Sequence, residues 1–166
     1  MLPLLVGALV LTRPSVAVQG PLARAFVQAP KGKTEFEFLP PRGFESQMRV
    51  LGHTEWLRRK ARIRIDWGLG FLKDSDGKSL KAFHDGIEAQ RKMGHAVKDV
   101  TIGKYSGTVL RIPVNKLDTG ADFHIALVSG FDMLSISYFD PTVEKKGLPA
   151  AQKEFLDMMA TGRFSH

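Results

Sequence analysis

Hydrophobic and polar residues alternate along several short stretches of the chain, which is the pattern of half-buried β-strands. Residues 34–39 read TEFEFL, and residues 61–67 place Ile63, Ile65 and Trp67 on one face with charged residues on the other. Pairing with neighbouring strands buries the apolar set and leaves the charged set in water. We therefore predict a strand over each stretch.

The same alternation predicts a run of strands in the second half of the chain. The predicted strands are residues 97–105, 108–114, 123–128 and 133–139. We expect Ser106 and Gly107 to form the turn between the first two, because short strands with tight connections are typical of an antiparallel meander.

Between these two groups of strands the apolar spacing becomes helical. Leu80 and Ile87 fall on one face of a 3.6-residue period, and this predicts a helix over residues 79–93. We expect Ser79 to cap the amino end of this helix and Gly94 to follow its last turn.

A second helix is predicted near the carboxyl end, where Pro149 suits the first turn of a helix. Its expected buried residues are Leu148, Phe155, Met158 and Met159. The predicted order of elements is strand, strand, helix, four strands and helix. Helices packed on an antiparallel sheet make an α+β fold, so this is the predicted fold class.

The amino end is read differently, because residues 2–11 form an uncharged apolar run. Ten residues are too few to span a bilayer but suit the apolar part of a signal peptide. Small residues at Ser15 and Ala17 suit the peptidase that removes such a segment. The alternative is a buried amino-terminal strand or helix, against which Pro3 and Pro14 argue.

These observations divide the chain into three parts. Residues 1–17 are expected to be a signal peptide, residues 18–33 a flexible lead-in rich in proline and glycine, and residues 34–166 one α+β domain. The expected location is therefore periplasmic or secreted. We do not expect the chain to span a membrane.

The amino-acid composition excludes several kinds of chemistry. The 166 residues include no cysteine, which excludes disulfides, thiolate metal sites and a cysteine nucleophile. The 24 Lys and Arg outnumber the 17 Asp and Glu and give a net charge of +7. Because no base-stacking or groove-reading motif accompanies this charge, nucleic acid is not an expected partner.

One basic cluster is a candidate partner-binding site: Arg58, Arg59 and Lys60, with Trp56 beside them and further arginines up to Arg64. Charge-assisted hydrogen bonds from these side chains suit an acidic partner or anionic lipid headgroups. The alternative is a solvated strand edge, where basic residues discourage edge-to-edge pairing.

Asp74-Ser75-Asp76-Gly77 resembles the start of a calcium loop. The third oxygen ligand is missing, and position 12 is Asp85 inside the predicted helix. We therefore interpret the segment as a turn, with a metal site at Asp74 and Asp76 as the alternative. No cofactor is expected.

Catalytic motifs are missing from the sequence, and we expect the protein not to be an enzyme. Serine elbows, phosphate loops and dinucleotide fingerprints are absent. His124 lies on the polar face of its predicted strand and is interpreted as a hydrogen-bonded surface histidine. An unrecognised hydrolase is the alternative, and it requires His124 or His84 to lie in a cleft against a carboxylate and a hydroxyl.

Several segments follow one another in an order that resembles the PsbP-like superfamily. They are Pro41-Arg42-Gly43-Phe44, Ser79 to Phe83, the hairpin from Ile102 to Gly107, and Gly162-Arg163-Phe164. The resemblance covers residues 34–164 and implies an α/β/α sandwich. The superfamily includes a photosystem II extrinsic subunit, DcrB-type periplasmic lipoproteins and type VI secretion immunity proteins. This chain lacks the cysteine that anchors the lipoproteins.

Members of that superfamily mostly bind or assemble other proteins. The resemblance and the predicted signal peptide together favour a non-catalytic exported domain that binds another protein, as an immunity or assembly factor. The expected partner is an acidic protein. A periplasmic carrier of a small molecule or lipid is the alternative, and it requires an apolar pocket enclosed by the sheet and helices.

Overall fold

A computed structural model describes residues 25–29, 34–50, 52–68, 72–73 and 77–165 of the chain. The predicted signal peptide, residues 1–17, lies outside the described residues. So do the candidate metal ligands Asp74 and Asp76.

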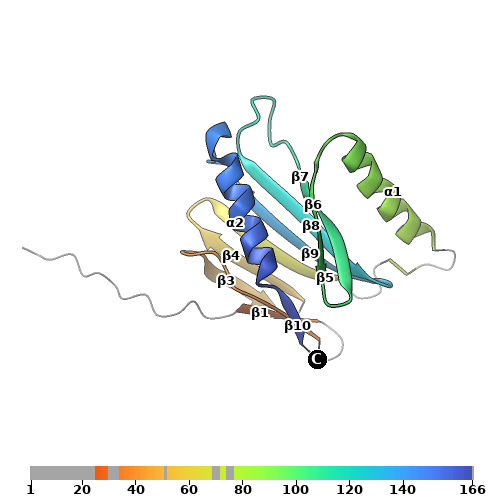
Figure 1. The fold of residues 1–166 in the computed structure, drawn as a ribbon. Coiled ribbons are helices and arrows are strands. Elements are labelled where there is room, and N and C mark those ends of the chain that lie inside the picture. Colours follow the sequence, from red (N-terminus) through yellow and green to blue (C-terminus); the bar gives the residue numbers. More distant parts are fainter. Residues whose placement is uncertain (1–24, 30–33, 51, 69–71, 74–76, 166) are drawn as a thin grey trace, which may run out of the picture.

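Ten strands and two α-helices make up the described part of the chain (Figure 1). The strands are β1 (Ala25–Gln28), β2 (Glu35–Phe38), β3 (Glu45–Val50), β4 (His53–Arg58), β5 (Ala61–Gly68), β6 (Ala96–Ile102), β7 (Tyr105–Arg111), β8 (Ala121–Ser129), β9 (Asp132–Asp140) and β10 (Arg163–Ser165). The helices are α1 (Lys78–Lys92) and α2 (Leu148–Ala160), with the short 3-10 helix η1 (Lys145–Gly147) before α2. This mixture of helices and antiparallel strands confirms the predicted α+β class.

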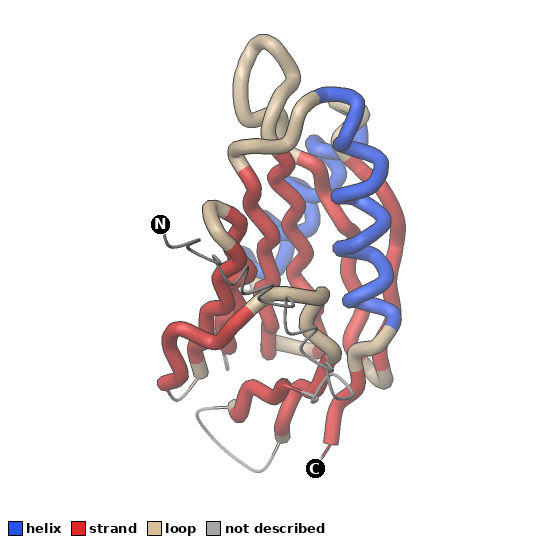
Figure 2. Tube along the Cα trace, turned by 90° about the vertical axis from the view of Figure 1, so that its left-hand side faces the viewer, coloured by secondary structure: helices blue, strands red, loops and turns tan. Residues whose placement is uncertain are grey.

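The strands form two antiparallel sheets. Seven of them pair in the order β3-β4-β5-β9-β8-β7-β6, and the other three in the order β1-β2-β10. Both edge strands of the large sheet change register, between Ser46 and Met48 in β3 and between Ala96 and Lys98 in β6. In Figure 2 the C-terminal strand β10 lies at the bottom of the molecule with α2 above it.

The centre of the large sheet follows the alternation in the sequence. In β5, Ile63 and Ile65 are buried while Arg62 and Arg64 are exposed. Ile65 lies opposite Ile136 of β9, which in turn lies opposite a buried residue of β8. One face of strands β5, β9 and β8 is therefore apolar from strand to strand, as expected for a sheet with one face on the core.

Helix α2 covers that apolar face. Its buried residues are Leu148, Ala151, Phe155, Met158 and Met159, which include the four expected from the sequence. The ring of Phe155 stacks on Phe123 of β8 with 5.9 Å between ring centroids. Full burial of a side chain such as Phe155 contributes about 1.5–3 kcal/mol.

The small sheet closes the rest of the apolar face with aromatic rings. Phe38 of β2 packs edge-on against Trp56 at 4.9 Å, and Phe164 of β10 stacks on Tyr105 at 4.1 Å. Trp67 donates its indole N–H to the carbonyl oxygen of Val27 at 3.0 Å. This hydrogen bond ties β1 to the large sheet and leaves the buried indole nitrogen with a partner.

Helix α1 lies on the opposite face of the large sheet. Ala126 and Val128 of β8 point toward α1, whereas Phe123 of the same strand points toward α2. No residue of α1 is buried. Helices therefore lie on both faces of the sheet, although the two differ in how tightly they pack.

The ends of α1 agree only in part with the prediction. Gly94 follows the last turn with a φ of 77°, as expected for a glycine after a helix. The helix begins at Lys78 and its N-cap residue is Gly77, so the expected cap at Ser79 is wrong. Ser79 lies within the first turn instead.

Two other expectations about segments are wrong, and one hairpin was not predicted. The lead-in predicted over 18–33 contains strand β1, which is stabilised by pairing with β2 rather than by its own pattern. The hairpin β3–β4 was not predicted, because Thr54 faces the core in a position that reads as polar. The turn between β6 and β7 is at Gly103 and Lys104, not at Ser106 and Gly107.

Gly107 has a different role, because a Cβ atom there would lie 2.2 Å from the carbonyl oxygen of Ala126. We predict that Gly107→Ala lowers the free energy of unfolding by about 1–3 kcal/mol, since β7 and β8 must move apart. In contrast, a Cβ at Gly86 in α1 meets no atom within 4 Å. Gly86→Ala should stabilise the protein by about 0.5–1 kcal/mol.

Urea unfolding of the two variants beside the wild type measures both changes. Equal effects of the two substitutions would contradict the close approach of β7 to β8.

Candidate functional site

The predicted basic cluster surrounds the hairpin between β4 and β5. Arg58 and Ala61 form the last pair of the ladder, so Arg59 and Lys60 make a two-residue turn. Strands β4 and β5 each pair on both sides. The interpretation of this cluster as a sheet edge is therefore wrong, because the edge strands are β3 and β6.

Arg58 is held by its neighbours rather than free to meet a partner. Its guanidinium donates two hydrogen bonds to the carboxylate of Glu154 in α2, each 2.7 Å long. It also lies over the ring of Phe44 at 4.4 Å. The hydrogen bond to Glu154 raises the pKa of Arg58, so the side chain stays charged. We infer that Arg58 fixes α2 to the β4–β5 hairpin.

Tyr138 belongs to the same network, because its hydroxyl donates to Glu154 at 3.0 Å. Burial raises the pKa of the Tyr138 phenol, and the nearby charge of Glu154 raises it further. The phenol therefore serves as a hydrogen-bond donor at every physiological pH.

The other three predicted contact residues differ in exposure. Trp56 is only 2% exposed and packs on Phe38, so its predicted role in partner contact is wrong. Arg59 and Lys60 are exposed. Within the described part of the chain, no ion pair involves either side chain. Arg59 also has a φ of 57°, in the left-handed region.

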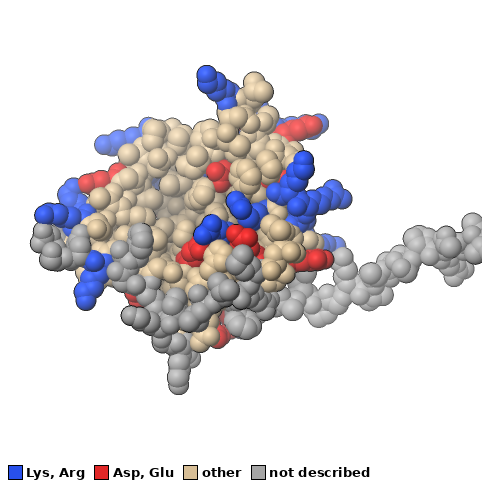
Figure 3. Space-filling model, turned by 180° about the vertical axis from the view of Figure 1, so that it is seen from behind, with Lys and Arg blue, Asp and Glu red and all other residues tan. Residues whose placement is uncertain are grey.

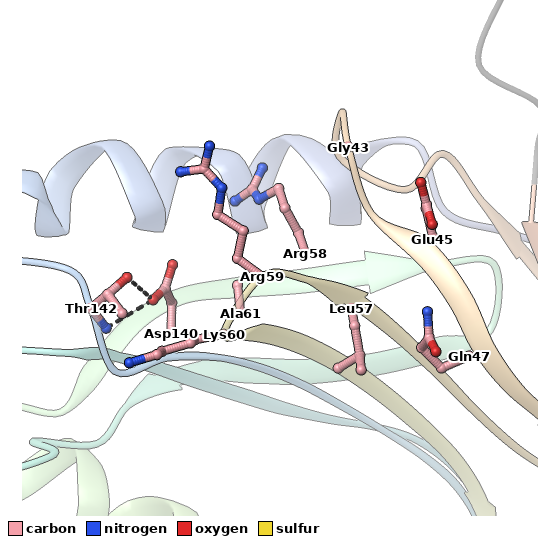
Figure 4. Close-up of a pocket in the computed structure, with 10 residues that line it drawn as sticks. All are labelled: Gly43, Glu45, Gln47, Leu57, Arg58, Arg59, Lys60, Ala61, Asp140 and Thr142. Atoms are coloured by element: carbon pink, nitrogen blue, oxygen red, sulfur yellow. Dashed lines mark hydrogen bonds between the residues drawn. The ribbon is translucent and has the colours of Figure 1, made fainter.

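A cleft of about 970 Å³ opens beside this turn. Figure 4 shows Lys60 extending toward Asp140 and Thr142 and Arg59 extending upward beside Arg58, with Glu45 across the cleft on β3. Asp140 accepts hydrogen bonds from the backbone N–H and hydroxyl of Thr142, at 2.9 and 2.6 Å. Both hydrogen bonds go to the Oδ1 atom of Asp140.

A second hollow of about 550 Å³ continues from the first and shares Arg58, Asp140 and Thr142 with it. Its far wall is formed by η1 and the start of α2, where Lys146 pairs with Glu144 at 3.0 Å. The two hollows make a continuous surface from β3 to α2. We refer to this surface as the hairpin cleft.

Polar residues on the face of the large sheet opposite α2 form a separate group. His53 contacts Asp66 at 2.5 Å, and Arg64 donates to the same carboxylate at 2.8 Å. Burial by itself raises the pKa of Asp66, but the hydrogen bonds from Arg64 and His53 outweigh it and lower the pKa. The alternation in β5 indicated that Asp66 faces outward, but no sequence pattern pointed to its partner on β4.

His124 also contacts a carboxylate, that of Asp122, at 2.6 Å. Ser137 of β9 is its cross-strand neighbour. The side chain of His124 is 45% exposed and lies on the same face of β8 as Ala126 and Val128. His84 is an exposed residue of α1 beside the ring of Phe83. Figure 3 looks at the molecule from behind, where acidic and basic side chains meet near the middle of the view.

Across the described ranges, no group of three or more His, Asp or Glu side chains is arranged to hold a metal ion. None of the helices in that part of the chain is long and apolar enough to cross a membrane.

The chain has two tyrosines, and burial raises the pKa of Tyr105 as it does that of Tyr138. We predict that in a spectroscopic titration of the folded protein each tyrosine is less than half ionised at pH about 10, where a free phenol is half ionised. The folded state holds these protons more tightly than the unfolded chain. Their contribution to stability is therefore complete below pH about 10 and is lost as the pH rises further.

Titration of the urea-unfolded chain is the control and should give two phenols with ordinary pKa values. Half-ionisation of Tyr138 near pH 10 in the folded protein would contradict its burial beside Glu154. Half-ionisation of Tyr105 near pH 10 would contradict the burial of Tyr105.

No protein-family model matches the chain, and no curated protein matches it. Among solved structures, a protein from Bacteroides thetaiotaomicron is similar to it with a TM-score of 0.47 and 15% sequence identity. The similarity covers 79% of this chain and 45% of that protein. The chain thus spans less than half the length of that protein.

Proposed function

We propose that this chain is a non-catalytic, exported protein-binding domain, and that its hairpin cleft binds a partner segment whose carboxylates meet Arg59 and Lys60. The single observation that carries the proposal is an exposed arginine at the rim of a cleft, in a strained backbone conformation and with no ion-pair partner among the described residues. The role as an immunity or assembly factor is a finer version of the same proposal.

The strain at Arg59 is the first step of the argument. A non-glycine residue with a φ near +57° is less stable than in the ordinary regions by about 1–2 kcal/mol. Glycine would relieve that strain, yet the chain has an arginine there. Strained residues of this kind concentrate at functional sites, so the guanidinium group of Arg59 is inferred to serve a binding role.

Preorganisation of the cleft wall is the second step. The bidentate pair of Arg58 and Glu154 fixes the hairpin against α2, and Phe44 covers the guanidinium. A partner that binds here does not have to order this wall, and a smaller ordering cost leaves more of the contact energy as affinity.

Charge is the third step. The whole chain carries a net charge of +7, which accelerates association with acidic partners. Arginine is also among the residues that most often dominate the binding energy of protein interfaces. Anionic groups of a partner, such as carboxylates, therefore suit Arg59 and Lys60.

The predicted signal peptide, residues 1–17, supports the exported location in this proposal. The exported location can be tested directly. We predict that amino-terminal sequencing of the mature protein from the producing cells starts at Val18, after loss of residues 1–17. Recovery of the chain only from the cytosol, with Met1 still in place, would remove the exported location.

The binding role predicts opposite effects of one substitution on stability and on binding. Arg59→Gly should raise the free energy of unfolding by about 1 kcal/mol, because glycine adopts positive φ without strain. The same variant should lose most of its partner binding. Unfolding in urea measures the first effect.

Binding is measured by photo-crosslinking in the producing cells, with the reactive residue placed at Gln47 in the cleft and, as a control, at Lys98 on the opposite edge of the sheet. A discrete adduct should form from Gln47 and disappear in Arg59→Gly. An adduct that survives in Arg59→Gly, or none at all from Gln47, would argue against the hairpin cleft as the binding site.

A charge-matched pair of variants separates the turn from general electrostatics. Arg59→Glu with Lys60→Glu should abolish the adduct. Lys98→Glu with Lys104→Glu changes the net charge equally at the other end of the sheet and should leave the adduct in place.

A further inference from the structure

The face of the large sheet opposite α2 is covered only in part. Helix α1 lies over β6, β7 and β8 at one side of the sheet (Figure 1). Toward the other side, the outward residues Arg62 and Arg64 of β5 are exposed. Their outward neighbours come from β4 and β9, because these strands pair with β5 on its two sides. We refer to this area of β4, β5 and β9 as the open face.

The open face changes in polarity along its length. Far from the β4–β5 turn it carries the polar cross-strand pair of His53 and Asp66. Next to the turn the outward positions are taken by Leu57 and Phe139, and both are half-buried. Each of them is a cross-strand neighbour of Arg62, one strand spacing or about 4.8 Å away. Arg62 therefore lies between two apolar side chains, and we call these three residues the Arg62 stripe.

Arg62 also differs from the ionisable residues around it. The other described outward ionisable side chains of β4, β5, β8 and β9 contact one another: Asp66 contacts Arg64 and His53, His53 contacts Glu55, and Asp122 contacts His124. None of the ion pairs among the described residues includes Arg62. The charge left over on these strands is thus a guanidinium, whose planar set of donors matches a carboxylate.

The Arg62 stripe is continuous with the hairpin cleft. Leu57 lines that cleft, and Figure 4 shows its side chain on the opposite side of β4 from the side chain of Arg58. Arg62 follows the turn residues Arg59 and Lys60 closely in the sequence. The cleft therefore opens onto the face that holds the stripe, and a segment bound by the turn can continue across it.

The apolar flanks make an ion pair at Arg62 more favourable than one at an isolated surface arginine. A partner side chain packed on Leu57 and Phe139 removes water from the guanidinium and its carboxylate, and their attraction increases as the local dielectric constant falls. An arginine surrounded by contacts that exclude water is typical of the residues that dominate interface energies. A carboxylate without apolar neighbours leaves the pair in water, where such pairs contribute little.

We propose that the partner segment of the hairpin cleft carries an acidic residue flanked by aliphatic or aromatic residues, and that this part of it docks on the Arg62 stripe. The inference rests on the proposed function and adds the sequence character of the partner. A protein segment presents a carboxylate and apolar side chains at adjacent positions. An anionic lipid headgroup supplies the charge but keeps its apolar chains beneath the membrane surface, so it matches only half of the stripe.

The experiment uses two fluorescent peptides of equal length and equal charge as probes. Each glutamate is flanked by leucines in one peptide and by serines in the other. Fluorescence anisotropy measures the affinity of the full chain for both. We expect the leucine peptide to bind about tenfold more tightly, because only its side chains pack on Leu57 and Phe139.

Variants assign this preference to the stripe. Arg62→Gln should weaken binding of the leucine peptide at least about fivefold. Lys98→Gln removes the same charge from the opposite edge of the sheet and should leave the affinity unchanged. Leu57→Gln should reduce the difference between the two peptides, and Phe139→Gln gives a second reading if Leu57→Gln lowers the melting temperature.

The proposal is overturned if the two peptides bind equally, if neither binds, or if Arg62→Gln binds as tightly as Lys98→Gln. Vesicles of phosphatidylglycerol and phosphatidylcholine are a further arm of the experiment. Co-sedimentation with these vesicles that is lost in Arg62→Gln would assign the stripe to a membrane surface and would also overturn the proposal.

The in-cell adduct from Gln47 keeps this proposal apart from the one on the hairpin cleft. The adduct should be weakened in Arg62→Gln. An adduct that disappears in Arg59→Gly but is unchanged in Arg62→Gln leaves the hairpin cleft as the binding site and removes only the role of the stripe.

Discussion

The burial of one continuous apolar face across strands β5, β9 and β8 is the constraint on which the rest of the structure depends. A shift of one residue in the pairing of β5 with β9 would turn Ile63 and Ile65 toward water and bring Arg62 and Arg64 into the core. The register is therefore fixed by the side chains. Helix α2 and the three-stranded sheet then have only one apolar surface on which to pack.

The elements with a strong periodicity of their own could be predicted from sequence. Strands β2, β5, β8 and β9 and both helices were found in this way. Strands β1 and β10 could not be predicted, because each is short and is stabilised by pairing with β2 from a distant part of the chain. The PsbP-like resemblance remains an expectation.

The candidate site was predictable to a smaller degree. The run of basic residues pointed to the β4–β5 hairpin, but it did not distinguish Arg58, which pairs with Glu154, from Arg59, which has no ion-pair partner among the described residues. That distinction comes from Glu154, which lies 96 residues away in the sequence. Trp56 was misjudged because an aromatic residue beside charges resembles an exposed anchor, whereas its ring is covered by Phe38 of the small sheet.

The irregularities in β3 and β6 have a consequence for how this molecule meets others. An outer strand with regular spacing offers its unpaired N–H and C=O groups to any extended peptide. Here the pairing of both edge strands of the large sheet changes register, near Ser46 in β3 and near Ala96 in β6. Addition of a further strand at either edge is therefore disfavoured. Contacts made along either side of the large sheet would therefore rely on side chains rather than on main-chain pairing.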